Sequence, residues 1–550
     1  MDTASLRKAR GAFFTPDPLA RYITDWAMRT VHDKVLEPSC GEAAFLLAAV
    51  DRLAVLREFA PAHPVPQLDG IELHATSAQA ARDLLGAAAV DARIRVGDFF
   101  TFEPTGSYDA VIGNPPYVRY QNFSGDSRVR SRAAALRAGV PLNGLASSWA
   151  AFTVHAALFL RRGGRLGLVL PAELLTVNYA AEVRRFLMER FARVDLVLFE
   201  ERVFPGVLEE VVLLLAAGCD EGPTDHCRIY RARNGDELPT AGLVRLWRPD
   251  RPDAKWTTSL LSVDIARPYS DLSSGPGFAL LEAWGDTTLG MVTGNNRYFA
   301  LSPDRVRQLG LTTSDVIPLS PPGSRHLRSL SFTTAALGEM GRRGAATWLF
   351  RPTGEPSGAA RAYIAAGEAL GVERAYKCRT RTPWWLVPLV RPADLLLTYM
   401  NADTPRLCAN RARVRHLNSV HGVYLKRGLR RLGTDLLPLA SLNSMTLLGA
   451  EVVGRAYGGG MLKLEPREAD RLPLPAPALV AAARKSLLAL RQQVARALRA
   501  RGLLEAVDLV DSLLLVGELG IPRGDIQPLR DGHAELMTRR ISRGASKPEA

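Results

Sequence analysis

The sequence predicts an α/β fold, with a mixed, mostly parallel and doubly wound sheet, followed by an α+β domain and C-terminal helices. Successive short apolar stretches near the N-terminus read as buried strands, and each ends in residues that can face a ligand. The periodicity changes downstream of residue 220, and residues 476–517 show helical periodicity with repeated Ala, Leu and Arg. These observations predict a ligand-binding α/β domain followed by a second, mixed domain.

The first predicted unit of the sheet spans residues 35–46. It reads as a strand, a tight turn and a helix that begins near Glu42. The first such turn of a doubly wound sheet presents a loop of small residues to a nucleoside cofactor. The residues of this loop that we expect to bind a cofactor are Glu37, Pro38, Ser39, Cys40 and Gly41.

Acidic residues end the next two predicted strands. Glu72 lies near the end of the strand at residues 67–73, where an acid can hold a ribose diol. Asp98 can accept a hydrogen bond from an exocyclic amine, and the Phe99 ring can lie against an adenine face. Either acid alone is more often a helix cap or a solvated loop residue. Their order along the chain favours a cofactor site.

The strand predicted at residues 108–112 leads into Asn114, Pro115, Pro116 and Tyr117, the most informative motif in the chain. The Asn114 side-chain oxygen and the Pro115 carbonyl can accept the two hydrogens of a planar amino group. Two acceptors orient the nitrogen lone pair towards an electrophile. The prolines stiffen the turn, and the Tyr117 ring offers a stacking surface for a base or an amide. The alternative is an Asn-Pro turn that closes a strand.

In this order the motifs resemble the gamma class of S-adenosylmethionine-dependent DNA methyltransferases, of the adenine-N6 restriction-modification type. Residues 11–16 resemble the N-terminal motif that folds over the methionine part of the cofactor. Residues 163–171 resemble the sixth-motif strand, and residues 204–206 resemble the loop that places a second aromatic ring against the base. The resemblance adds Phe13, Thr15 and Pro16 to the cofactor site and Phe204 to the base site.

The resemblance implies a Rossmann-like methyltransferase domain over residues 1–220. It implies transfer of a methyl group from S-adenosylmethionine to the N6 amino group of an adenine flipped out of duplex DNA. Asn114 and Pro115 would hold N6, Asn114 would also lie beside the cofactor, and Tyr117 would stack on the base. One position departs from the family, because its second loop glycine is Ala43 here. Alanine is acceptable at that position if its φ angle is negative.

The remaining chain divides into a connector with short strands (221–270), a target-recognition domain (271–475), a helical segment (476–541) and a disordered tail (542–550). Residues 289–299 resemble the opening of the recognition domain of this family, and residues 442–464 resemble its closing segment. Asn295, Asn296 and Arg297 could reach base edges, and a hairpin turn is the alternative for these residues.

Two basic stretches without acidic residues follow, at residues 374–391 and 406–431, and both contain aromatic side chains. Interleaved aromatic and basic residues favour contact with phosphates and bases, whereas a solvated surface is the alternative. The candidate DNA contacts are Arg379, Arg381, Arg411, Arg413, Arg415 and Lys426.

Composition restricts the class of protein. The net charge of +14 favours a polyanionic partner, although it does not distinguish DNA from RNA. The five cysteines are scattered, none in the Pro-Cys context of a cytosine-C5 nucleophile, and no pair has the spacing of metal ligands. We therefore expect no metal. No signal peptide or spanning apolar segment is visible, which predicts a cytoplasmic, prokaryotic protein without a membrane partner.

Several alternatives stay open from the sequence. RNA adenine-N6 methylation uses the same chemistry, and cytosine-N4 methylation uses the same motif on another amino group. The same motif also serves enzymes that methylate glutamine side chains of proteins. A DNA-specificity subunit without catalysis is the non-enzymatic alternative. We expect double-stranded DNA as the partner, a monomeric chain, and a separate cognate restriction endonuclease as a further candidate partner.

Overall fold

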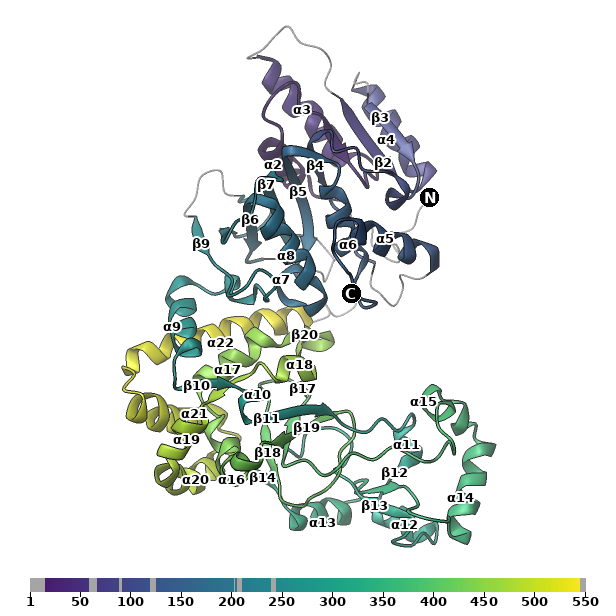
Figure 1. The fold of residues 1–550 in the computed structure, drawn as a ribbon, viewed down its shortest axis with the longest axis vertical. Coiled ribbons are helices and arrows are strands. Elements are labelled where there is room, and N and C mark those ends of the chain that lie inside the picture. The colour runs from purple at the N-terminus through teal and green to yellow at the C-terminus, as the bar shows by residue number, and fades with distance from the viewer. Residues whose placement is uncertain are drawn as a thin grey trace, which may run out of the picture. The chain divides into compact units, whose positions relative to one another are not determined.

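The computed structural model describes residues 15–58, 67–88, 92–118, 125–201, 203–204, 210–238 and 244–544. Phe13 therefore lies outside the described residues. The chain forms two compact units, Met1–Leu260 and Leu261–Ala550. Figure 1 shows the elements of each unit along the chain.

Unit 1 is built on a nine-stranded sheet with the strand order β3-β2-β1-β4-β5-β7-β6-β8-β9. The five strands from β3 to β5 in this order are parallel, β7 is antiparallel to β5 and β6, and β9 is antiparallel to β8. The strands are β1 (Val35–Glu37), β2 (Leu68–Glu72), β3 (Ala92–Val96), β4 (Tyr108–Gly113), β5 (Leu160–Pro171), β6 (Phe191–Phe199), β7 (Val211–Cys219), β8 (Cys227–Ala232) and β9 (Arg245–Trp247). The prediction of a mixed, mostly parallel α/β sheet is confirmed.

Helices flank this sheet because their apolar residues share a core with the strands. α2, α3 and α4 contribute to one buried cluster together with Val169, Leu213 and Leu215 of the sheet. α6 packs against β5 and also contacts α5 and α8. The helices of unit 1 are α2 (Asp17–Ala27), α3 (Ala44–Glu58), α4 (Ala75–Ala87), α5 (Gly125–Arg137), α6 (Ser148–Ala157), α7 (Glu173–Thr176) and α8 (Ala181–Arg190), with the short 3-10 turns η1 (Phe99–Thr101), η2 (Asn178–Ala180) and η3 (Thr257–Leu260).

The predicted connector at residues 221–270 is corrected by the structure. Most of this segment belongs to unit 1, because β8 pairs in parallel with β6 and β9 pairs with β8. The boundary between the two units falls after Leu260, rather than at residue 220 or 270. Cys227, Ile229 and Ala232 of β8 are buried, so the strand extends the core of unit 1 instead of linking two domains.

Unit 2 contains four small sheets and most of the remaining helices. The five-stranded sheet has the order β11-β19-β16-β18-β14, and the others are β12-β15-β13, β17-β21-β20 and β10-β22. The strands are β10 (Phe278–Leu280), β11 (Gly285–Leu289), β12 (Ala300–Leu301), β13 (Val316–Pro318), β14 (Ser331–Phe332), β15 (Trp348–Phe350), β16 (Leu395–Thr398), β17 (Met400–Asn401), β18 (Leu407–Asn410), β19 (Val420–Leu425), β20 (Arg455–Tyr457), β21 (Met461–Lys463) and β22 (Pro473–Pro475).

The helices at the C-terminus share a core with the five-stranded sheet. Leu395 and Val423 of the sheet, Leu487 of α20 and Val507 of α21 lie in one buried cluster. The predicted helical segment and the predicted recognition domain are therefore parts of one compact unit. The helices of unit 2 are α9 (Val263–Ser274), α10 (Leu281–Trp284), α11 (Asn296–Phe299), α12 (Pro303–Gln308), α13 (Thr334–Arg342), α14 (Gly358–Ala369), α15 (Tyr376–Arg379), α16 (Arg430–Ala440), α17 (Ser444–Val453), α18 (Pro466–Ala469), α19 (Pro477–Ala482), α20 (Arg484–Arg499), α21 (Leu503–Asp511) and α22 (Arg523–Gly544), with the shorter turns η4 (Val372–Arg374), η5 (Arg427–Leu429), η6 (Gly458–Gly460) and the π-helical η7 (Ser512–Glu518).

No single helix among those described is long and apolar enough to cross a membrane. One pair of helical segments, Arg427–Ala440 and Ser444–Val453, is long and apolar enough when the two are taken together, but the pair is bent by 92°.

A buried histidine makes unit 2 sensitive to acid. The His416 ring is fully buried, and a Cβ atom added at Gly422 would lie 2.5 Å from the ring, so glycine leaves the room that the imidazole fills. Burial lowers the pKa of His416 to about 4. In the unfolded chain the imidazole is protonated below its ordinary pKa of about 6.5. In the folded chain it is protonated only below about pH 4. The contribution of the neutral His416 ring to the free energy of unfolding is therefore fully present above pH 6.5, and it is lost as the pH is lowered towards 4.

We expect the variant His416→Phe to lose less stability than the wild type when the pH is lowered from 7 to 5. The difference should be about 2 kcal/mol, because one pKa unit corresponds to about 1.4 kcal/mol between protonation states. Urea unfolding of both chains at the two pH values measures it. An identical pH dependence of the two chains would contradict the assignment of this effect to His416.

Candidate active site

The carboxyl ends of the parallel strands bring the predicted motifs to one edge of the sheet in unit 1. β1 pairs with β2 on one side and with β4 on the other, and all three run in parallel. The loop after β1, Glu72 at the end of β2 and the Asn-Pro-Pro-Tyr motif after β4 therefore emerge together. This edge is where doubly wound sheets bind nucleotide-like ligands.

Backbone hydrogen bonds fix the loop after β1 against the end of β2. The Cys40 amide donates to the Ile71 carbonyl at 3.0 Å, and the Gly41 amide donates to Glu72 Oε2 at 2.9 Å. Glu72 Oε1 accepts from the His74 amide at 2.9 Å. The Glu72 carboxylate is thus held by two peptide groups, and its oxygens keep further lone pairs for a hydroxyl ligand.

The loop itself has the left-handed backbone that small residues favour. Gly41 has φ +51°, and no described atom lies within 4 Å of the position that a Cβ atom would occupy there. Ala43 has φ +67°, so the condition that its φ be negative is not met. A left-handed alanine costs about 1–2 kcal/mol. The fully buried Ala43 side chain belongs to the core cluster of unit 1, which holds the loop in this conformation.

Glu37, at the end of β1, is hydrogen-bonded to the helix that follows the loop. Its side chain is buried and accepts a hydrogen bond from the Leu46 amide at 3.1 Å, in the first turn of α3. Burial raises the pKa of Glu37 well above its ordinary value; the Leu46 and Phe45 amides oppose this effect, and the charge of Glu72 adds to it. The structure therefore gives Glu37 a role at the start of α3, and its direct contact with a cofactor stays a prediction.

Asp98 and Phe99 follow β3, as predicted, but both side chains have protein partners. Asp98 Oδ1 accepts from the Phe100 amide at 3.1 Å, and Oδ2 accepts from Arg130 Nε of α5 at 3.0 Å. The Phe99 ring lies 4.7 Å from the ring centroid of Phe152 and 4.6 Å from that of His155, both in α6. Their roles toward an adenine stay predictions, and Arg130 is a neighbour that sequence reasoning did not identify.

Asn114 joins the N-terminal motif, the cofactor loop and the motif that it begins. Its side-chain Nδ2 donates to Thr15 Oγ1 at 3.2 Å, and its carbonyl accepts from Ser39 Oγ at 3.2 Å. These contacts connect residues that are 99 and 75 positions apart in the sequence. Pro16 directly precedes α2 as its N-cap residue, and its carbonyl accepts from the Leu19 amide at 3.0 Å. Three separately predicted segments thus meet at one residue.

Tyr117 is anchored at its hydroxyl group. The hydroxyl donates to the Val169 carbonyl of β5 at 2.8 Å, and the ring packs partly buried against the core cluster of unit 1. Phe204 belongs to the same cluster and is 4% exposed. The structure thus places both predicted base-stacking rings in one cluster, and their contact with a base stays a prediction.

Sequence reasoning did not identify Ser148, which contacts this motif. Its hydroxyl accepts from the Val118 amide at 2.8 Å and donates to the Pro116 carbonyl. A serine just before an apolar helical segment is a helix-start signal, but nothing in the sequence indicates a partner thirty residues away.

The predicted DNA contacts of unit 2 fall into two groups. Asn295 caps α11 by accepting from the Tyr298 amide, Arg381 donates to the Val292 and Thr293 carbonyls, and Arg415 donates to the Val390 carbonyl. These three side chains are engaged within the protein. The exposed members are Asn296, whose side chain accepts from Thr293, together with Arg297, Arg379, Arg411, Arg413 and Lys426.

Several ring side chains of the basic stretches are buried rather than available to a ligand. His416 and His421 are fully buried, and His421 Nε2 lies 2.7 Å from the Leu464 carbonyl. The Tyr424 hydroxyl donates to the Arg391 carbonyl, and Arg411 forms an ion pair with Asp435. The interleaved pattern therefore arises in part from the core of the unit.

In the part of the chain that the structure describes, no group of three or more His, Cys, Asp or Glu side chains is arranged to hold a metal ion. The five cysteines are all buried and unpaired with one another.

Comparison with known proteins gives two family matches and several relatives. Residues 83–204 match the model of the Eco57I restriction-modification methylase, and residues 253–515 match that of the C-terminal domain of the Type II methyltransferase M.Eco57I. The Type II methyltransferase M.XamI of Xanthomonas campestris pv. amaranthicola is 28% identical over 84% of this chain and 85% of its own length. The Type II methyltransferase M.AccI of Acinetobacter calcoaceticus is 22% identical over the same shares.

A solved structure resembles both units. The Type IIL restriction-modification enzyme MmeI, determined in complex with DNA, matches 95% of this chain and 75% of its own with a TM-score of 0.53 and 12% identity. At this identity the likeness concerns the fold alone.

Proposed function

Because the chain belongs to the S-adenosylmethionine-dependent restriction-modification DNA methyltransferases, we propose that it methylates the N6 amino group of an adenine flipped out of duplex DNA. The single observation that carries the proposal is the junction at Asn114, where Thr15, Ser39 and the Asn-Pro-Pro-Tyr motif meet. The contact with Ser39 supports the proposal because it brings Asn114, which Pro115 directly follows, beside the loop that is expected to bind the cofactor.

The residues at the edge of the sheet fit S-adenosylmethionine. Glu72 is held with lone pairs available for a ribose diol, and the space over Gly41 admits a ligand close to the backbone. Asp98 would accept from the adenine amino group, after sharing or releasing its contact with Arg130. When bound, the cofactor supplies a sulfonium methyl group, which N6 takes with loss of one proton to water, leaving S-adenosylhomocysteine.

Asn114 and Pro115 orient the acceptor nitrogen. The hydrogen bond from Nδ2 to Thr15 sets the plane of the Asn114 amide, so that its oxygen is directed as an acceptor. The Pro115 carbonyl is the second acceptor, and its position is set by the two prolines. Two acceptors on the N6 hydrogens keep the nitrogen lone pair directed at the methyl group, which lowers the barrier through orientation. Tyr117 would stack on the flipped base and Phe204 would form its second aromatic contact.

Duplex DNA is the proposed partner because the chain carries a net positive charge and because its relatives are named Type II methyltransferases. The chain has a net charge of +14, and Arg297, Arg379, Arg413 and Lys426 of unit 2 are exposed. Phosphate contacts by such cations provide sequence-independent affinity. The relatives M.XamI and M.AccI are named Type II methyltransferases, and MmeI was solved with DNA. We propose a monomeric, cytoplasmic enzyme with a separate cognate endonuclease as its partner.

Purified chain incubated with methyl-labelled S-adenosylmethionine and equal amounts of duplex DNA, RNA and protein tests this function. We expect label in DNA, and after nucleoside digestion all of it in N6-methyladenine. Label in N4-methylcytosine would show that cytosine, rather than adenine, is the target base. Label in RNA or protein alone would overturn DNA as the proposed substrate. Binding of DNA without any transfer would support the specificity-subunit alternative.

A further inference from the structure

Ser148 holds the peptide groups on both sides of Tyr117. Its hydroxyl accepts a hydrogen bond from the Val118 amide at 2.8 Å and donates one to the Pro116 carbonyl. The Ser148 amide in turn donates to the Val118 carbonyl at 3.0 Å. One side chain and its own amide therefore make three hydrogen bonds to the residues that flank the stacking ring.

The burial of Ser148 makes these bonds difficult to replace. The residue is 2% exposed, so water has little access to the Pro116 and Val118 peptide groups through it. A buried peptide group that loses its partner is strongly unfavourable, and the chain would move to recover a partner. The geometry of the Asn-Pro-Pro-Tyr loop therefore depends on this hydroxyl.

A polar network anchors the helix that presents Ser148. Trp149, the next residue of α6, is fully buried, and its Nε1 donates to the Tyr179 hydroxyl at 3.1 Å and lies 3.3 Å from Glu173 Oε2. The Tyr179 hydroxyl donates to Glu173, and Ser147 Oγ lies 3.1 Å from the Tyr179 hydroxyl. The first turn of α6 is thus fixed to the segment that follows β5.

We propose that Ser148 is a positioning residue for methyl transfer, which sets the orientation of the Tyr117 ring and of the Pro115 carbonyl beside it. This inference rests on the proposed function. Tyr117 is held at its hydroxyl by Val169, and the peptide groups on both sides of it are held by Ser148. Removal of the Ser148 hydroxyl takes away two of these three bonds to the peptide groups, so the ring can shift about its hydroxyl anchor. A misplacement of about 1 Å in a positioning group can lower a rate by about 100-fold.

The test compares Ser148→Ala with Thr153→Ala in single-turnover methylation of DNA. Thr153 lies on the same helix, is fully buried, and bonds only to the Trp149 carbonyl of its own helix among the described contacts, so it is a matched control. We expect Ser148→Ala to lower the rate of transfer by about 10- to 100-fold with nearly unchanged KM for S-adenosylmethionine. We expect Thr153→Ala to lower that rate less than twofold.

A second comparison separates positioning from loss of folding. In a Tyr117→Ala background the ring is absent, so the further loss caused by Ser148→Ala should shrink to a few-fold. The fluorescence of 2-aminopurine at the target base reports whether the base is still flipped but poorly stacked. A further variant, Ser148→Thr, keeps the hydroxyl group and should recover most of the rate. An equal rate in Ser148→Ala and wild type, or an equal loss in both backgrounds, would overturn the proposal.

An inactive wild-type chain would refute the proposed function rather than the role of Ser148. The two failures are therefore distinguishable, because the inference on Ser148 is read only as a difference between variants of an active chain.

Discussion

Replacement of Asn114 by alanine should lower the rate of methyl transfer by about 100- to 1,000-fold, the loss typical of removing one preorganised polar group at a reacting centre. The side chain has two functions that alanine cannot perform. We propose that its oxygen accepts a hydrogen from the target amino group, and its Nδ2 donates to Thr15 Oγ1. The Asn114 carbonyl, which accepts from Ser39, is a backbone group and stays in the variant.

Single-turnover kinetics with saturating cofactor measure this loss directly. Affinity for DNA should change less than threefold, because phosphate contacts provide most of it. Asn178→Ala, at an exposed asparagine of η2, is the matched control and should leave the rate unchanged. An Asn114→Ala chain with a rate within threefold of the wild type would show that the motif does not hold the reacting nitrogen.

Replacement of Arg540 by alanine should lower the free energy of unfolding of unit 2 by about 3–5 kcal/mol, because it leaves a buried carboxylate without its partner. Arg540 of α22 forms two hydrogen bonds with Glu451 of α17, at 3.0 and 2.7 Å, and both side chains are 3% exposed. Burial raises the pKa of Glu451 and the charge of Arg540 lowers it. Because the pKa of Glu451 stays raised, the hydrogen bonds and the charge of Arg540 offset only part of the cost of burying this carboxylate.

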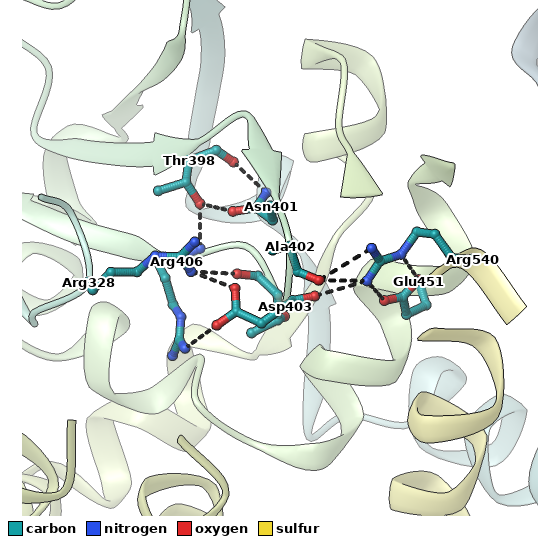
Figure 2. Close-up of polar contacts among 9 residues, drawn as sticks. Arg328, Thr398, Asn401, Ala402, Asp403, Arg406, Glu451 and Arg540 are labelled. Carbon is teal, nitrogen blue, oxygen red and sulfur yellow. Dashed lines mark hydrogen bonds and ion pairs between the residues drawn. The ribbon is translucent and has the colours of Figure 1, made fainter. Parts of the chain in front are cut away.

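Figure 2 shows that Arg540 also joins distant parts of unit 2. Its guanidinium donates to the carbonyls of Ala402 and Asp403 at 3.4 and 3.2 Å. The Asp403 side chain in turn binds Arg328 at 2.6 Å and Arg406 at 3.0 Å. The C-terminal helix is thus connected through one arginine to the turn between β17 and β18.

Urea unfolding of three chains separates the ion pair from the packing. Arg343→Ala removes an exposed pair with Glu339 and should cost less than about 1 kcal/mol. The double variant Arg540→Met/Glu451→Met leaves no charge at the site of this pair, and its loss should be much smaller than that of Arg540→Ala. Equal losses for Arg540→Ala and Arg343→Ala would contradict the importance of the buried pair.

The strands and loops of the candidate site could be predicted because their signals are local. The strand expected at residues 108–112 is β4 (Tyr108–Gly113), and that expected at residues 67–73 is β2 (Leu68–Glu72). Parallel pairing then explains why their ends meet. The φ angle of Ala43 could not be predicted in this way, because the packing of its side chain in the core decides it.

Longer-range features were missed for a physical reason. Short strands were expected at residues 221–270, but the pairing of β8 with β6, about thirty residues earlier, has no local signal, and this pairing makes β8 part of the sheet of unit 1. The environment of an arginine depends on tertiary contacts, so the sequence does not distinguish Arg381, which binds two carbonyls, from the exposed Arg379. Ser148 meets its partners only after the sheet has formed.

The most direct test of the central claim is single-molecule modification sequencing of DNA from a methylation-free host that expresses this chain or its Asn114→Ala variant. We predict N6-methyladenine at one sequence motif with the wild-type chain and none with the variant. A mark that persists in the variant would contradict the role of Asn114. The absence of any mark with the wild-type chain, expressed and folded, would contradict DNA adenine methylation by this protein.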